Sequence, residues 1–119
     1  MLDLGAIEGV IEDIGKVSGV ENVVVISKSG MHLAGKVPKS AHLETYSAML
    51  AILLGAAETV SSEIGTELGH VVIKFSGSRM MVMDNGPKAV LALTLSKTAD
   101  EAGVASEVRS ASKKLEELI

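Results

Sequence analysis

The first half of the chain changes from a helical to a strand-like hydrophobic pattern and back. Residues 2–17 place apolar side chains three or four positions apart with acidic residues between them, which predicts an amphipathic helix. Residues 20–27 and 31–37 are strand-like runs joined by a Ser-Lys-Ser-Gly turn. A long helix over about residues 41–64 follows, with Ser40 as its predicted N-cap.

The second half contains three more predicted strands and a final helix. The strands cover residues 70–75, 79–84 and 89–95, and the turns between them are so short that neighbouring strands must be antiparallel. Thr98 and Glu101 form a capping-box pattern that opens the last helix. The predicted order is α-β-β-α-β-β-β-α, an α+β fold in one domain over residues 1–119.

The predicted strands are continuous apolar runs. Residues 23–26, 71–73, 80–83 and 90–93 lack the alternation of a sheet with one solvated face. Both faces of the sheet should therefore be covered. Three helices can do this with two on one face and one on the other.

The composition narrows the class of protein. Of the 119 residues, 47% are hydrophobic and 22% are charged, which is typical of a globular chain whose core is almost entirely aliphatic. The net charge of -4 argues against nucleic-acid and anionic-membrane partners. There is no cysteine, which excludes disulfides and thiolate chemistry.

The same sequence favours a cytoplasmic protein. The N-terminus has no basic region followed by a cleavable apolar stretch, so no signal peptide is expected. The longest apolar run, residues 48–57, is much shorter than the roughly 20 residues of a membrane span, and we expect it to be a buried helix with no membrane insertion.

No segment carries a convincing catalytic pattern. Residues 30–36, GMHLAGK, nearly match a phosphate-binding loop, but Val37 stands where a Ser or Thr must hold magnesium, and the segment reads as turn plus strand. His32, His42 and His70 lack metal-ligand spacing. We therefore expect no metal, no cofactor and no enzyme activity.

Arg79 allows two interpretations. At the turn between the third and fourth strands it could act as an arginine finger toward a partner's phosphate. An ordinary surface arginine is the more common outcome.

The long helix has two apolar faces. The first is made mainly of larger side chains: Leu43, Met49, Leu50, Leu53, Ala57, Val60 and Ile64. The adjoining face is made mainly of small ones: Ala48, Ala51, Ile52, Gly55 and Ala56. Glycine within a helix costs about 1 kcal/mol relative to alanine, which a close helix–helix contact would offset. The alternative is that the small residues pack against the chain's own sheet. However, the long helix is apolar around more of its circumference than one face of a sheet can cover, so we favour a symmetric contact between two copies of the helix.

The chain resembles the roadblock/LC7 family, including bacterial MglB-like and archaeal members. The resemblance rests on the element order and on three stretches: residues 17–30, the Ala- and Leu-rich helix 47–65, and residues 69–75 with the two strands that end at 93–95. Lys28 and Ser29 depart from the acidic residue that the family often has before the turn glycine.

This resemblance implies a profilin-like architecture with a five-stranded antiparallel sheet in the order 2-1-5-4-3. One long helix would cover one face and two helices the other. It also implies homodimers, or heterodimers with a paralogue, formed by paired long helices and paired third strands. The implied dimer interface is Ala48, Ala51, Ile52, Gly55, Ala56, Val71 and Ile73.

The resemblance further implies a homodimeric regulatory platform that binds a Ras-like small GTPase and modulates its GTPase cycle. Such a platform positions the GTPase's own switch loops and needs no catalytic residue of its own. The main alternative is a scaffold or adaptor, like a motor light chain, with no effect on hydrolysis. A ligand sensor of profilin- or PAS-like layout has less support, because the chain offers few aromatic or polar anchors for a pocket.

Overall fold

The computed structural model describes residues 2–119, and its elements follow the predicted order. They are α1 (Leu4–Gly15), β1 (Val20–Ser27), β2 (His32–Gly35), α2 (Leu43–Glu63), β3 (Val71–Lys74), β4 (Ser78–Asn85), β5 (Ala89–Ser96) and α3 (Glu101–Leu118). The predicted strand and helix positions are confirmed, with differences of a few residues at their ends.

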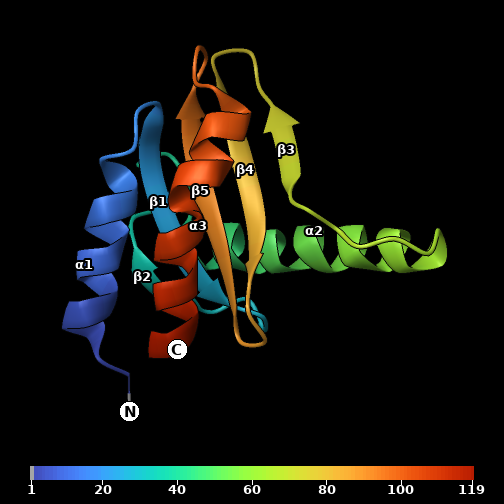
Figure 1. Ribbon diagram of the computed structural model, residues 1–119, viewed down its shortest axis with the longest axis horizontal. Coiled ribbons are helices and arrows are strands. Elements are labelled where there is room, and N and C mark those ends of the chain that lie inside the picture. Colours follow the sequence, from blue (N-terminus) through green and yellow to red (C-terminus); the bar gives the residue numbers. More distant parts are fainter. Residues whose placement is uncertain (1) are drawn as a thin grey trace.

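The five strands form one antiparallel sheet in the order β2-β1-β5-β4-β3. The implied topology is therefore confirmed, and β2 and β3 are the edge strands. Figure 1 shows α1 and α3 side by side on one face of the sheet, while α2 runs across the opposite face and projects beyond β3. The predicted division of the helices, two on one face and one on the other, is also confirmed.

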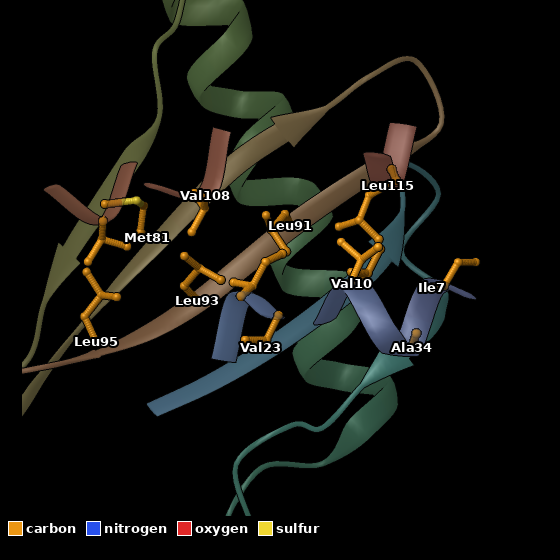
Figure 2. Packing of buried hydrophobic residues seen from close by; sticks show 14 residues of the cluster. Ile7, Val10, Val23, Ala34, Met81, Leu91, Leu93, Leu95, Val108 and Leu115 are labelled. Atoms are coloured by element: carbon orange, nitrogen blue, oxygen red, sulfur yellow. The ribbon is translucent and has the colours of Figure 1, made fainter. Parts of the chain in front are cut away.

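Each face of the sheet has its own hydrophobic core. Successive residues of a strand point to opposite faces, so Val23 and Val25 pack under α1 and α3, whereas Val24 and Ile26 pack under α2. Figure 2 shows the larger core, where Leu91 and Leu93 of β5 meet side chains of both covering helices. The continuous apolar runs are explained by burial on both faces.

Two predicted helix starts are wrong for the same physical reason. Ser40 lies in a turn closed by a hydrogen bond from the Ala41 amide to the Pro38 carbonyl (2.9 Å), and α2 is instead capped by His42. Thr98 likewise lies in a turn, and Asp100 occupies the N-cap position of α3. In both places the chain completes a turn before the helix begins, which moves the start by two residues.

Arg79 on β4 holds the start of α3 against the sheet. Its guanidinium donates to Glu101 Oε1 at 2.6 Å and to the Ser96 carbonyl at 3.1 Å, and it also bonds the Ala99 carbonyl. The Arg79 side chain is only 14% exposed. Both interpretations from the sequence are thus wrong, because this arginine is neither at the free surface nor available to a partner.

We expect Arg79→Ala to lower the free energy of unfolding by about 2 kcal/mol, because it leaves a partly buried carboxylate and several carbonyl acceptors without their hydrogen-bond donor. Urea denaturation measures this loss. Arg109, exposed on α3, provides the matched control: Arg109→Ala should change the free energy by less than about 0.5 kcal/mol. Equal effects of the two substitutions would contradict the assigned role of Arg79.

Candidate protein–protein interface

Helix α2 is mostly exposed although it is largely apolar. Ser47, Leu50 and Leu54 are its only buried residues, whereas Ile52 is 61% exposed and Ile64 is 73% exposed. The prediction that residues 48–57 form a buried helix is therefore wrong for this chain taken alone. The reason is length: 21 residues extend about 31 Å, and Figure 1 shows that the end of α2 passes beyond the sheet.

The exposed apolar surface of α2 continues onto the adjacent edge strand. β3 pairs with β4 on one side only, and its Val71 and Ile73 are half-buried on the α2 side of the sheet. We call this surface the α2–β3 face. It comprises Met49, Ile52, Ala56, Val60, Ile64, Val71 and Ile73.

The structure divides the small residues of α2 into two groups. Ala48 and Ala51 pack on the turn at Gly30, where a Cβ would come within 3.0 Å of the Ala48 Cα and 3.6 Å of the Ala51 Cβ. Gly30 also has a φ of +94°, which favours glycine. Packing within the chain therefore explains why these two residues are small. The sequence left such intramolecular packing open as the alternative to a dimer contact.

The other predicted interface residues of α2 point away from the sheet. Ile52, Gly55 and Ala56 are exposed, and nothing lies within 4 Å of a Cβ built on Gly55. The predicted interface omits Met49, Val60 and Ile64, which are all more than half exposed. The sequence already indicated that these three residues could be exposed, because the predicted helix is apolar around most of its circumference.

An apolar groove of about 450 Å³ lies between the first half of α2 and strands β3 and β4. Its lining is almost wholly hydrophobic: Ala41, His42, Thr45, Tyr46, Met49, Leu50, Leu53, Ile73 and Met80. Tyr46, one of the lining residues, is half-buried and hydrogen-bonds Thr94 of β5. A groove of this composition suits an apolar protein surface better than a polar ligand.

A lysine in the β1–β2 turn lies close to the second half of α2. Lys28, in the β1–β2 turn, pairs with Asp84 at the end of β4 and lies 4.0 Å from Glu58 on α2. The buried Leu50 and Leu54 and the Gly30 contact hold α2 on the sheet, and the Lys28 pair with Glu58 adds little because both side chains are partly exposed.

By length and composition α2 would also suffice to cross a membrane. Its mean hydropathy is 1.2 over the most apolar window, of which 17% is buried. A single helix of this kind is weak evidence for a membrane span, because a helix that packs on a sheet and is covered by a partner protein can have the same composition.

The other candidate residues do not converge. His32 bonds the Gly35 carbonyl at 2.8 Å, His42 caps α2, and His70 precedes β3. Within residues 2–119 no group of three or more histidine or acidic side chains is placed to hold a metal ion. Residues 30–36 form a turn and strand β2, which confirms the hairpin interpretation of that segment.

Comparison with known proteins identifies the family. The Roadblock/LC7 domain model matches residues 6–95, and the chain therefore belongs to the Roadblock/LC7 family. A relative is the uncharacterized protein MJ0714 of Methanocaldococcus jannaschii, which is 30% identical over 92 residues, 76% of this chain and 78% of that protein.

Solved structures show the same fold. An MglB with tetrameric arrangement superposes with a TM-score of 0.84 at 22% identity, covering 97% of this chain and 88% of that one. MglB of Myxococcus xanthus gives 0.85 at 15% identity with the same coverage. The profilin-like part of the fold prediction is confirmed too, since LokiProfilin1 from a complex with rabbit actin covers 97% of each chain at a TM-score of 0.65 and 15% identity.

Burial raises the pKa of Tyr46 above 10.0, with the hydrogen bond to Thr94 acting in the opposite direction. Because Tyr46 is the only tyrosine, the ultraviolet titration of tyrosinate reports this group alone. We expect a midpoint above 10 in the folded protein, with stability decreasing as the pH rises from 10 toward that midpoint. The urea-unfolded chain is the control and should titrate near 10; equal midpoints would contradict the burial of Tyr46.

Proposed function

We propose that this chain is a homodimeric regulatory platform that binds a Ras-like small GTPase and modulates its GTPase cycle. The observation that carries the proposal is the α2–β3 face, a large apolar surface left uncovered on a Roadblock/LC7 fold. Single exposed apolar residues are ordinary, but a contiguous apolar patch marks an interaction site.

Self-association is the first half of the proposal. An unpaired apolar edge strand such as β3 invites pairing with another chain, and the neighbouring helix is exposed beside it. The MglB neighbour with a tetrameric arrangement supports self-assembly of this fold. Covering the α2–β3 face would also bury exposed apolar residues that give α2 its membrane-like composition.

Binding of a GTPase is the second half, and it is supported by family membership. The resemblance noted from the sequence implies a Ras-like partner, and a dimeric platform would act by binding one switch-loop arrangement more tightly than another. The acidic net charge of -4 is in keeping with a protein partner rather than nucleic acid. We place this function in the cytoplasm.

One observation favours the alternative of a scaffold that does not affect hydrolysis. Activation by an arginine inserted in trans needs a free guanidinium, and Arg79 is bound within its own chain to Glu101 and to backbone carbonyls. Arg79 is therefore not free to act as an arginine finger, and a scaffold would not need one.

Gly55→Lys should convert the dimer to a monomer without unfolding it. The added side chain meets open space in the single chain but would place a charge in the apolar contact. Gly9, on α1, is equally open and helical, so Gly9→Lys is a control matched in charge and in helix propensity. Sedimentation velocity should give a dimer for the wild type and Gly9→Lys; a dimeric Gly55→Lys would refute the assigned interface.

The GTPase is tested by affinity capture from source-cell lysate, loaded in parallel with a GTP analogue and with GDP. We expect a small GTPase enriched with the GTP analogue, and its purified form should turn over GTP at a different rate when the platform is added. Binding with unchanged turnover would establish the scaffold instead. Capture of partners regardless of nucleotide, with no GTPase among them, would contradict the regulatory role.

A further inference from the structure

We infer that the Asn85–Gly86 pair in the β4–β5 turn is a site of spontaneous deamidation, and that docking of the end of α3 on this turn controls the reaction. Asn85 is the last residue of β4, and Gly86 follows it. Asparagine is a thermolabile residue, and it is especially labile before glycine, which has no side chain to obstruct attack on the asparagine amide. Neither residue belongs to the α2–β3 face, so the site does not depend on the proposed dimer.

The reaction needs only these two residues and water. The Gly86 amide nitrogen forms a bond to Asn85 Cγ, the Cγ–Nδ2 bond breaks, and ammonia leaves with the amide proton. One water molecule then opens the five-membered succinimide to give aspartate or isoaspartate at position 85. Either product adds a negative charge, and isoaspartate also lengthens the main chain where Asn85 pairs with Ala89 of β5.

Contacts with α3 restrain the Asn85 side chain. The residue is 2% exposed, and its Oδ1 accepts a hydrogen bond from Ser112 Oγ at 2.6 Å. Glu116, one turn further along α3, packs on Gly86: a Cβ built on Gly86 would lie 2.6 Å from Glu116 Cγ. Figure 1 shows the end of α3 and the β4–β5 turn at the same end of the sheet. Because ring closure must move the Asn85 amide and the ring must then meet water, the end of α3 has to leave the turn first.

The product should weaken the same docking. Asn85 lines a cavity of about 340 Å³ together with Glu116, Glu117 and Lys88. A carboxylate at position 85 would be buried and would face two acidic side chains against one lysine, which is unfavourable. It would also lie near the C-terminal end of α3, where the helix dipole disfavours negative charge. Deamidation therefore acts as a one-way switch that loosens the last turns of α3.

The composition makes the reaction measurable in the whole protein. Asn22 is the only other asparagine, it precedes the β-branched Val23, and the chain contains no glutamine. Trypsin separates residues 80–88, which include Asn85, from residues 17–28, which include Asn22. During incubation at neutral pH we expect mass spectrometry to find the amide-to-acid mass change on residues 80–88. The urea-unfolded chain should react several-fold faster than the folded protein.

Ser112→Ala removes the hydrogen bond to Asn85 and should raise the rate in the folded protein about fivefold, as the loss of one ordinary hydrogen bond allows. Ser110, exposed on the same helix, provides the matched control, and Ser110→Ala should leave the rate unchanged. Arg79→Ala releases the opposite end of α3 and should accelerate the reaction less than Ser112→Ala. Asn85→Asp reproduces one product and should speed hydrogen exchange of the amides in residues 112–118.

Four results would overturn the inference. If residues 80–88 gain no acid even in the unfolded chain, the site is wrong. Equal rates in the folded and unfolded chains, or in Ser112→Ala and the wild type, would refute control by α3. A faster reaction in Arg79→Ala than in Ser112→Ala would mean that global unfolding exposes Asn85. Unchanged hydrogen exchange in Asn85→Asp would refute the loosening of α3 by the product.

Discussion

The structure depends on one mismatch: α2 carries more apolar surface than its own sheet can cover. Only three of its residues are buried, because the helix spans about 31 Å and runs across and beyond the edge of a sheet whose last strand, β3, is four residues long. Burying apolar surface contributes about 25 cal/mol per Å², so leaving this face in water is unfavourable. A partner surface is the direct way to relieve it.

The remainder of the fold acts as a support for that exposed helix. The opposite face of the sheet is closed by α1 and α3 over the larger core, and Arg79 fixes the start of α3 through Glu101. On the α2 side, the buried Leu50 and Leu54 and the contact of the Gly30 turn with Ala48 and Ala51 set the position of the helix. A helix held at several points loses little further freedom on binding, which favours association.

The polar side chains and the exposed apolar surface have different roles in this fold, which is in keeping with the lack of a recognisable catalytic motif in the sequence. The polar contacts of Arg79, of Asn85 with Ser112 (2.6 Å), and of Lys28 with Asp84 all stabilise junctions between elements. The exposed α2–β3 face, on which the proposed function rests, is made of apolar side chains. Such a surface recognises other proteins by shape and burial, in keeping with a family of regulatory and adaptor domains.

The sequence by itself determined the element order, the burial of both sheet faces and the family, because hydrophobic periodicity and turn residues act over short distances. It did not determine where α2 and α3 begin, since the turns at residues 38–41 and 96–99 depend on backbone hydrogen bonds that no spacing reveals. Only the tertiary structure decided which small residues are free: Ala48 and Ala51 serve the Gly30 turn, whereas Gly55 stays open. That distinction depends on a contact between segments nearly 20 residues apart, which local pattern cannot encode.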